Sequence, residues 1–569
     1  MRMDGFIFTR SPNGRECMCM ELLRKAKKGL LYLKHYGLSD FVVRLEEKRE
    51  EAKMPYDSWY QNHKASEETL KSQRQESAFW ENAPKISIVT PLYHTPERFL
   101  EEMIASVQGQ SYENWELCLA DGSEGTDLET VVQKAAAEDR RIRYQKLGEN
   151  LGIAGNTNAA LRMAEGDWIA FLDHDDLLAP EALFEAVVRI RAAEKEQPYD
   201  MLYTDEDKVD LEGKKHFSPH FKPDWNPELL CSNNYITHFL FVRRTLADKV
   251  GAVKTTFDGA QDHDYILRCT EAASHIGHIP KILYHWRCHE ASTADNPLSK
   301  QYAVDAGVRA VSEHLKRNGI NALVEATKNM GFYKVTYPIS GQPLVSVICT
   351  GETKDFAIRT GYTGIEILSE GDREKAKGEY LLFFDGGLVP QTSDWLERML
   401  GVCELPGVGA VGAKILTSDG KIFHAGIVLG IGVQKLADNV FYGMKENRSG
   451  YMHRASLQMD YSAVSGCCLL IRREVYNRVL GVAENLSLPA QMLDLCLKVG
   501  KAGGRIVYEP GAVLRLKNET AQKRWNPRTA WKPSDSSYLK EKWEEYFQKA
   551  DACYNPNFGT EKADYSLAE

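Results

Sequence analysis

The chain of 569 residues repeats itself, and this repeat constrains the fold more than any other feature of the sequence. Four segments of the first half return in the second half in the same order. The pairs are PKISIVTPLY (84–93) with PLVSVICTGE (343–352), EGDWIAFLDHDDLL (165–178) with KGEYLLFFDGGLV (377–389), LFVRRTLADKVGAV (240–253) with LLIRREVYNRVLGV (469–482), and DHDYILRC (262–269) with MLDLCLKV (492–499). Such ordered similarity predicts two tandem domains of one fold, with a boundary near 335–343.

The first copy alternates short apolar runs with helical patterns. KISIVT (85–90), ELCLADGS (116–123) and WIAFLD (168–173) have the length and composition of buried strands. Between the first two runs, apolar residues recur at helical spacing, which predicts an amphipathic helix. These residues are Phe99, Leu100, Met103, Ile104 and Val107. Strands that alternate with helices predict an α/β domain with a largely parallel sheet.

Charged, helix-prone sequence precedes the first strand, and the composition changes at that point. We therefore expect four parts: a helical N-terminal extension (1–83), a first α/β domain (84–340), a second α/β domain (341–520) and a C-terminal tail (521–569). Apolar residues make up 43% of the chain and charged residues 27%, which is typical of a folded globular enzyme.

Composition also argues against several classes of partner and location. The formal net charge of −9 gives no electrostatic reason to expect a nucleic-acid partner. No apolar run approaches the roughly 20 residues that span a bilayer, and the N-terminus lacks the apolar core of a signal peptide. The 12 cysteines form no CxxC pair, which favours reduced thiols in a cytoplasm over a disulfide framework or a zinc ribbon.

Three carboxylates crowd the end of the third expected strand, in FLDHDDLLAP (171–180). Asp173 and Asp175 are two positions apart, so on an extended strand they project from the same face. Two hard oxygen ligands at this spacing suit Mg²⁺ or Mn²⁺, which often bind carboxylates together with substrate phosphates. The alternative is a loop whose acids cap the helix expected near Pro180, a role open to Asp176 in either case.

Further segments accompany this one in a recognisable order. They are SIVTPLYHTPERFLEEMIASVQGQSYENWELCLADGS, ENLGIAGNTNAALRMAEGDWIAFLDHDDLLAPEAL, YTDEDK, DGAQDHDYILR and YHWRCHEAST, and together they cover about 88–293. With these segments the sequence resembles the family 2 glycosyltransferases of the GT-A fold, in particular rhamnosyltransferase-like bacterial enzymes of surface-polysaccharide assembly. The resemblance implies two tandem GT-A-like domains of the nucleotide-diphospho-sugar transferase type, and an inverting sugar transfer that uses Mn²⁺ or Mg²⁺.

The resemblance also implies nucleotide-binding residues. Pro91 and Tyr93 would border the base, Asp121 would hydrogen-bond it, and Asn158 matches a position near the nucleotide. Each has an ordinary alternative: strand termination for Pro91 and Tyr93, an Asx-turn before Gly122 for Asp121, and a helix N-cap for Asn158. LADGS supplies one carboxylate where many relatives have two adjacent acids.

By the same resemblance, Asp173 would contact the ribose or the metal, and Asp175 the metal. In YHWRCHEAST (284–293), His289 is the favoured metal ligand and Arg287 the favoured diphosphate contact. His285 is an alternative metal ligand, and either histidine could instead be structural.

Transfer to a sugar hydroxyl needs a carboxylate that accepts the proton as the new bond forms. The resemblance assigns this base to Asp262 in GAQDHDYILR (259–268). Gln261 stands where relatives often have Glu, and Asp264 could orient Arg268. The alternative is that both acids simply begin a helix.

The segment FKPDWNPELLCSNNYITHF (221–239) combines aromatic and amide side chains, which suit sugar rings. Trp225, Asn226 and Asn233 are therefore candidate acceptor residues. A proline-rich surface loop would have a similar composition.

The second copy lacks most of these groups. Asp385 keeps the first carboxylate, but Gly387 stands where Asp175 stands in the first copy, and Met492 stands where Asp262 stands. We therefore expect the second domain to be degenerate and to serve as a scaffold, an acceptor-binding surface or a partner site.

The sequence thus predicts a cytoplasmic, metal-dependent, inverting glycosyltransferase of cell-surface polysaccharide synthesis. It would transfer a sugar, rhamnose or another hexose, from a UDP- or dTDP-sugar to a glycan or lipid-linked glycan. One alternative is a catalytically inactive carbohydrate-binding scaffold. Another is a nucleotidyltransferase, which would need a glycine-rich phosphate loop after the first strand, and TPLYHTPERF is not such a loop.

Residues 20–38 hold five Lys or Arg residues among several leucines, with no acid between Leu22 and Ser39. Each basic residue near an anionic leaflet contributes about 1 kcal/mol, so this segment could dock peripherally at the inner face of the cell membrane. The alternative is an amphipathic helix that packs on the protein itself.

Overall fold

The computed structural model describes residues 29–30, 32–34, 37–38, 40–49, 54–289, 301–350, 360–432, 434–517, 519–526, 528 and 531–569. The chain divides into two compact units, Met1–Pro55 and Tyr56–Glu569. In the first unit, residues 40–49 are helical. Most of the basic segment 20–38 lies outside the described residues. None of the described helices has the length and apolar character needed to cross a bilayer.

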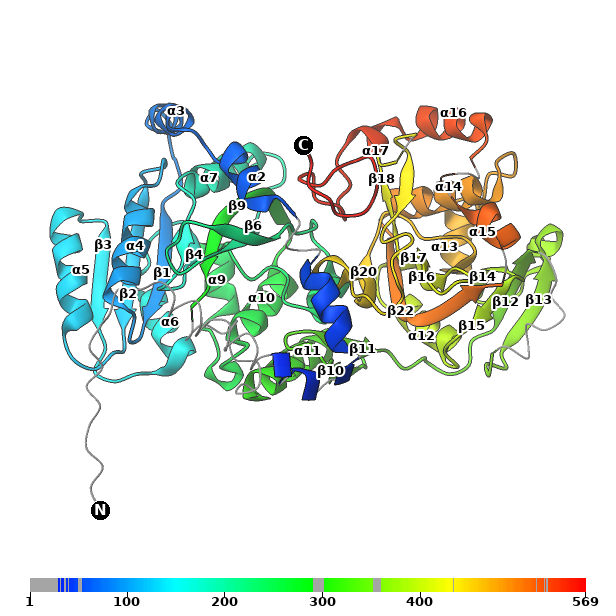
Figure 1. Ribbon diagram of the computed structural model, residues 1–569, viewed down its shortest axis with the longest axis horizontal. Helices are drawn as coiled ribbons and strands as arrows, with labels where there is room; N and C mark the ends of the chain where they lie inside the picture. The colour runs from blue at the N-terminus through cyan, green and yellow to red at the C-terminus, as the bar shows by residue number, and fades with distance from the viewer. Residues whose placement is uncertain are drawn as a thin grey trace, which may run out of the picture. The chain divides into compact units, whose positions relative to one another are not determined.

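The first α/β domain is built on a nine-stranded sheet (Figure 1). Its strand order is β3-β2-β1-β4-β8-β6-β9-β5, and β7 pairs with β6 at the side of this path. The strands are β1 (Ile86–Leu92), β2 (Trp115–Asp121), β3 (Ile142–Lys146), β4 (Trp168–Phe171), β5 (Leu177–Leu178), β6 (Met201–Val209), β7 (His216–His220), β8 (Leu240–Arg243) and β9 (Ile276–Arg287). The three strands expected from the apolar runs are confirmed as β1, β2 and β4.

The sheet is mixed, so the prediction of a largely parallel sheet is only partly correct. Strands β1 to β4 pair in parallel, as do β6 and β9, but β8 lies antiparallel to both β4 and β6. An apolar run shows that a strand is buried but carries no information about its direction. The reversal places the start of β8 beside the carboxyl end of β4, where Leu240 pairs with Phe171.

Helices connect and cover the strands of this domain. They are α4 (Glu97–Gln108), α5 (Asp127–Glu138), α6 (Gly152–Met163), α7 (Ala182–Ala193), α8 (Pro227–Ser232), α9 (Arg244–Val250), α10 (Gln261–Ala272) and α11 (Gln301–Arg317). Helix α6 packs on β1 and β2, and α5 packs on β3 (Figure 1). All five residues of the apolar stripe predicted for α4 are buried.

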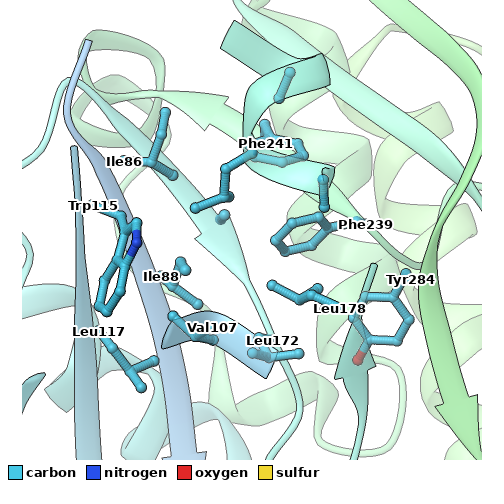
Figure 2. Packing of buried hydrophobic residues seen from close by; sticks show 14 of the residues in the cluster. Ile86, Ile88, Val107, Trp115, Leu117, Leu172, Leu178, Phe239, Phe241 and Tyr284 are labelled. Atoms are coloured by element: carbon cyan, nitrogen blue, oxygen red, sulfur yellow. The ribbon is translucent and has the colours of Figure 1, made fainter. Parts of the chain in front are cut away.

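The hydrophobic core lies between the sheet and the helices that cover it. Figure 2 shows Trp115, Ile88 and Leu117 grouped on one side of this cluster, and Phe239 and Tyr284 on the other. Tyr284 is fully buried on β9, and its hydroxyl reaches the carboxylate-rich segment after β4. The core therefore fixes the position of the edge at which the predicted site residues gather.

The second α/β domain has the same strand order with one strand fewer at the edge. Its sheet runs β13-β12-β14-β21-β16-β22-β15, with β17 beside β16 and β20 beside β22. The strands are β12 (Val345–Thr350), β13 (Ile365–Ser369), β14 (Tyr380–Asp385), β15 (Leu388–Pro390), β16 (Val408–Leu416), β17 (Ile422–His424), β20 (Met459–Asp460), β21 (Cys468–Arg472) and β22 (Arg505–Leu516). The strands β1, β2, β4, β8, β6, β9 and β5 thus correspond to β12, β13, β14, β21, β16, β22 and β15.

The helices of the second domain follow the same plan. They are α12 (Trp395–Cys403), α13 (Arg473–Arg478) and α14 (Leu488–Lys501), followed by α15 (Glu519–Trp525), α16 (Pro533–Lys542) and α17 (Glu544–Gln548). A short 3₁₀ segment, Glu370–Lys375, stands where the first domain has α6. The prediction of two tandem α/β domains with a helical N-terminal segment is confirmed.

Three further segments belong to the larger compact unit. Helices α2 (Tyr56–His63) and α3 (Glu67–Ser77) precede β1, and the β10–β11 hairpin (Leu323–Ala326 and Tyr333–Thr336) follows α11. The C-terminal segment contacts both domains: Asn555 donates to Asp205 at 2.8 Å, while Asp551 accepts from the backbone of Leu429 at 2.7 Å. The bounds of the four predicted parts remain predictions.

Candidate active site

Four segments meet at the carboxyl edge of the first sheet, where open α/β sheets usually bind ligands. One is the turn after β4, with Asp173, Asp175 and Asp176. The others are the loop that leads into β8, the first turn of α10 with Asp262, and the end of β9. The antiparallel course of β8 is what brings the loop before it to this edge.

Asp176 is a buried anchor of the turn and does not cap a helix. It accepts hydrogen bonds from the Tyr284 hydroxyl (2.5 Å) and from the Arg287 backbone (2.8 Å). Burial raises the pKa of Asp176 well above its usual range, and the charges of Asp175 and Asp173 add to this effect. Helix α7 begins only at Ala182, so the capping alternative is wrong for this residue.

Asp173 faces His238, a residue that the sequence analysis did not select. Their closest atoms, Oδ2 and Nε2, are 3.7 Å apart, and His238 Nδ1 lies 3.1 Å from Glu206 Oε2. The imidazole stacks on the Tyr284 ring at 4.4 Å. Burial lowers the pKa of His238, but Asp173 and Glu206 outweigh it and raise the pKa to about 10. A cation therefore lies beside Asp173, whose side chain is half exposed.

Asp175 lies next to His289, as expected if both residues bind the same metal ion. Asp175 Oδ2 and His289 Nε2 are 2.6 Å apart. Arg287 is fully buried behind them: its Nε donates to the Asp175 carbonyl (2.8 Å), and its guanidinium pairs with Glu102 (2.7 Å). Arg287 thus supports the backbone that carries Asp175, and its predicted diphosphate contact stays a prediction.

The geometry distinguishes the two candidate histidines of YHWRCHEAST. His285 is buried away from Asp175, with Nδ1 at 2.6 Å from Asp207 and Nε2 at 3.0 Å from the Tyr60 hydroxyl. His216 pairs with the other oxygen of Asp207 at 2.8 Å. This arrangement supports His289 over His285 as the ligand beside Asp175.

The donor atoms at this edge suit Mn²⁺ or Mg²⁺, which take carboxylate oxygens and, for Mn²⁺, imidazole. Asp173, Asp176 and His238 offer one ligand atom each within 4.8 Å of one another. Asp175 and His289 form the neighbouring pair. Of the predicted metal ligands, Asp173 thus belongs to the first group, and Asp175 and His289 form the second. Both groups lie at the turn after β4.

Asp262 lies in the first turn of α10 and is open to solvent. Its Oδ2 accepts a hydrogen bond from Asn234 Nδ2 at 2.9 Å. Desolvation by the surrounding protein raises the pKa of Asp262, and the charge of Asp173 acts in the same direction. Asp264 is buried and pairs with Arg268 at 2.8 Å, as the sequence suggested.

The predicted nucleotide residues lie at the ends of β1, β2 and within α6. Pro91 is in β1, and Tyr93 follows it with 42% of its surface exposed. Asp121 is fully buried and accepts from Ser123, Tyr144 and Lys146, each at 2.8 Å.

The bond from the Ser123 backbone to Asp121 is the Asx-turn named as the alternative. Gly122 is required there, because a Cβ would lie 2.6 Å from Asn156. Asn158 is inside α6, so the N-cap alternative is wrong. It exchanges hydrogen bonds of 2.7 and 2.9 Å with the backbone of Val253. A nucleotide contact by Asp121 or Asn158 stays a prediction.

The candidate acceptor residues are separated in the structure. Asn226 caps α8 and bonds the backbone of Asp460, and Asn233 donates to the Gly331 carbonyl at 2.9 Å. Both amides therefore hold the backbone together. Trp225 lines a cavity between the two domains. Asn234, the neighbour of Asn233, is the amide that contacts Asp262.

Among the described residues, helix α15 fills the corresponding edge of the second domain. Asp385 Oδ2 accepts from Arg524 and Trp525 of α15, both at 2.7 Å. A Cβ at Gly387 would lie 3.0 Å from Ala521 of the same helix. A cavity there, whose described lining includes Met492 and Trp525, measures about 10 Å³, which is space for no more than about one water.

Comparisons with known proteins give a family match within the first domain. Residues 87–251 match the model of the glycosyl transferase family 2. The chain is 35% identical over 548 residues to the uncharacterized protein y4gI of Sinorhizobium fredii, covering 86% of this chain and 59% of that protein. It is 32% identical over 535 residues to the O-antigen biosynthesis protein RfbC of Myxococcus xanthus, covering 85% and 41%. The chain thus spans about half the length of these curated relatives.

Among solved structures, TarS 1–349 of S. aureus in complex with UDP-GlcNAc is similar at 20% identity and a TM-score of 0.34, over 41% of this chain and 66% of that one. The family match covers β1 to α9, the segment that carries the carboxylate-rich turn. The first α/β domain therefore carries a segment that matches the glycosyl transferase family 2.

Proposed function

We propose that this chain transfers a sugar from a nucleotide-diphospho-sugar to a hydroxyl of a glycan or lipid-linked glycan in cell-surface polysaccharide synthesis. The observation that carries the proposal is the meeting of Asp173, the Asp175–His289 pair and Asp262 at one edge of the first sheet. The donor is a UDP- or dTDP-sugar, with rhamnose or another hexose as the group transferred.

Asp173, Asp175 and His289 would hold the divalent cation, Mn²⁺ or Mg²⁺. When bound, such a cation supplies positive charge that stabilises the leaving nucleoside diphosphate. His238 adds a second positive charge at the same edge, next to Asp173. Charges that are already in place stabilise a developing anion without costly reorganisation.

Asp262 accepts the proton of the acceptor hydroxyl as that oxygen attacks the anomeric carbon of the donor. Its raised pKa supports this role, because a more basic carboxylate is a better proton acceptor provided that it remains ionised. Asn234 keeps one carboxylate oxygen in place by a hydrogen bond of 2.9 Å. A single displacement of this kind inverts the configuration at the anomeric carbon.

The names of two relatives support the polysaccharide setting. One is an O-antigen biosynthesis protein, and another, 36% identical over 102 residues, is a glucosyltransferase named for an undecaprenol-linked glycan in Campylobacter jejuni. Such a setting suits a chain that works in the cytoplasm near the membrane. Peripheral docking through residues 20–38 would bring it to a lipid-linked acceptor.

A nucleotide-sugar panel tests the proposed activity. The purified chain is incubated with UDP- and dTDP-sugars, with Mn²⁺, Mg²⁺ or a chelator, and release of nucleoside diphosphate is measured. We expect metal-dependent hydrolysis of at least one donor. Hydrolysis of none, combined with retained binding of saccharides, would instead support the inactive carbohydrate-binding scaffold.

Vesicle co-sedimentation tests the membrane contact separately. Full-length chain should bind anionic vesicles at low salt and lose this binding at high salt, whereas a chain without residues 1–45 should not bind. Equal binding of both forms, or no binding of either, would show that the N-terminal segment is not a membrane anchor.

A further inference from the structure

A cavity of about 310 Å³ lies between the two α/β domains, apart from the carboxyl edge. Its volume falls at the lower end of the range for small-ligand sites, which often occur at domain interfaces. Helices α8, α10 and α11 form one side, and the turn after α12 with the start of β22 forms the other. The lining residues that matter here are Trp225, Glu271, His314, Asn318, Leu405 and Arg505.

The polar groups of this cavity are held in fixed positions by ion pairs. Glu271 lies 2.7 Å from His314 Nδ1 and 2.7 Å from Arg317. Arg505 donates to Glu228 at 2.8 Å, so its charge is already neutralised. The pairing between Arg505 and Glu228 also ties the second domain to α8 of the first.

This chemistry favours a neutral sugar over other small ligands. A nucleotide or phosphate needs unpaired positive charge or free backbone amides, and Arg505, the arginine among the described lining residues, is paired with Glu228. A lipid chain needs a wholly apolar lining, whereas this cavity combines apolar side chains with carboxylates, an imidazole and an amide. An indole face beside a few fixed polar groups suits a sugar ring.

One segment of the first domain connects the cavity to the candidate active site. Trp225 and Cys231 line the cavity, Asn234 bonds Asp262, and His238 faces Asp173. Asn234 is three positions after Cys231, so their Cα atoms are at most about 11 Å apart. A chain of a few sugars could occupy the cavity and present a hydroxyl to Asp262 at the same time.

We propose that this interdomain cavity binds a neutral sugar of the acceptor glycan, remote from the hydroxyl that reacts. The inference rests on the proposed function and deepens it, because it makes the acceptor an oligosaccharide rather than a single sugar or a bare lipid. It also gives the second domain a task, since Leu405 and Arg505 complete the walls of the cavity.

Saccharide binding to two variants, one that enlarges the cavity and one that fills it, tests this assignment. Trp225→Ala removes the aromatic face, and Thr270→Tyr fills the cavity from α10. The probes are saccharides of one to six residues built from glucose, galactose, N-acetylglucosamine, N-acetylgalactosamine or rhamnose. Their binding is measured by saturation-transfer NMR. Phe79→Ala is the matched control, because Phe79 is an aromatic residue that is 85% exposed outside the cavity.

We expect at least one oligosaccharide to bind, more tightly than its monosaccharide, and both cavity variants to weaken it by about 10-fold or more. Phe79→Ala should bind like the parent chain. Donor hydrolysis, measured in parallel, shows that each variant is folded. Normal donor hydrolysis with no saccharide bound, or with binding unchanged in both variants, would overturn the cavity assignment. If the parent chain itself hydrolyses no donor, that result would instead contradict the proposed function.

Discussion

The two α/β domains share their strand order but differ at the edge where a site would form. In both, a serine in the first strand accepts from a glycine backbone at 2.7 Å and donates to a glutamate: Ser87, Gly166 and Glu116 in one domain, Ser346, Gly378 and Glu366 in the other. These contacts lie at the amino ends of the strands. The frame of the fold has therefore been kept in both copies, far from the edge that carries chemistry.

At the carboxyl edge the two copies diverge residue by residue. Cys467 stands where His238 stands, and Met492 where Asp262 stands. Cys467 supplies no positive charge, because burial keeps its thiol neutral by raising the pKa to about 12, and the cation beside Asp385 is Arg524 of α15. Gly466 leaves room for the Met492 side chain, since a Cβ at position 466 would lie 1.9 Å from Met492.

The two copies share the sheet and differ in the strand-end loops, where binding and catalytic residues of α/β proteins usually lie. In the second copy, α15 donates Arg524 and Trp525 to Asp385, so a carboxylate that could have held a metal has become a structural acceptor. The second copy then contributes to the molecule through its surface, at the cavity that it shares with the first.

The largest expected effect comes from removing the proton acceptor. Asp262→Asn keeps the shape of the side chain but removes its basicity, so transfer should fall by about 10²-fold or more while donor binding survives. Met492→Leu, at the corresponding position of the second domain, should leave the transfer rate unchanged. Initial rates of both variants measure the contrast, and a near-normal rate for Asp262→Asn would remove this residue from the mechanism.

A second pair of variants compares the carboxylates of the two turns. Asp175→Ala should abolish metal-dependent donor hydrolysis, whereas Asp385→Ala should leave it nearly unchanged. Asp385→Ala should instead destabilise the fold by about 1–3 kcal/mol, because Arg524 and Trp525 lose their buried acceptor. Hydrolysis assays and urea unfolding separate the two effects. Similar losses of activity in both variants would mean that the second domain holds a working site.

A smaller effect concerns His238, which corresponds to Cys467 in the second domain. The folded-state pKa of His238 is raised from 6.5 to about 10, because Asp173 and Glu206 outweigh the opposing effect of burial. The stability that its charge contributes should be fully present below about pH 6.5 and lost as the pH rises through about 10.

His238→Gln should therefore lower the free energy of unfolding more at the acidic end of this range than at the alkaline end. Urea unfolding across the range measures the difference between the parent and the variant. A difference that does not change with pH would show that His238 is not charged in the folded chain.

Much of this arrangement could be predicted from the sequence because it depends on local patterns. The apolar runs located β1, β2 and β4, and the ordered repeats revealed the second domain. His238 was missed because its importance depends on the antiparallel course of β8, which places it beside Asp173. The closure of the second site was also invisible, since it is made by α15, more than 100 residues after Asp385.

The acceptor residues show the same limit. Trp225, Asn226 and Asn233 have similar sequence surroundings, yet one lines a cavity and the other two satisfy backbone groups. The packing of the second domain against Asn226, and of the β10–β11 hairpin against Asn233, distinguishes them. Composition indicated that the segment could bind a sugar, but which of its side chains remain available depends on distant contacts.

The most direct test of the division between the two copies is the number of donor sites. Calorimetric titration of the chain with Mn²⁺ and the nucleoside diphosphate of its donor gives this number. We expect one site per chain, lost in Asp175→Ala and retained in Asp385→Ala. Two sites per chain, or one site that is lost in Asp385→Ala and kept in Asp175→Ala, would contradict this expectation.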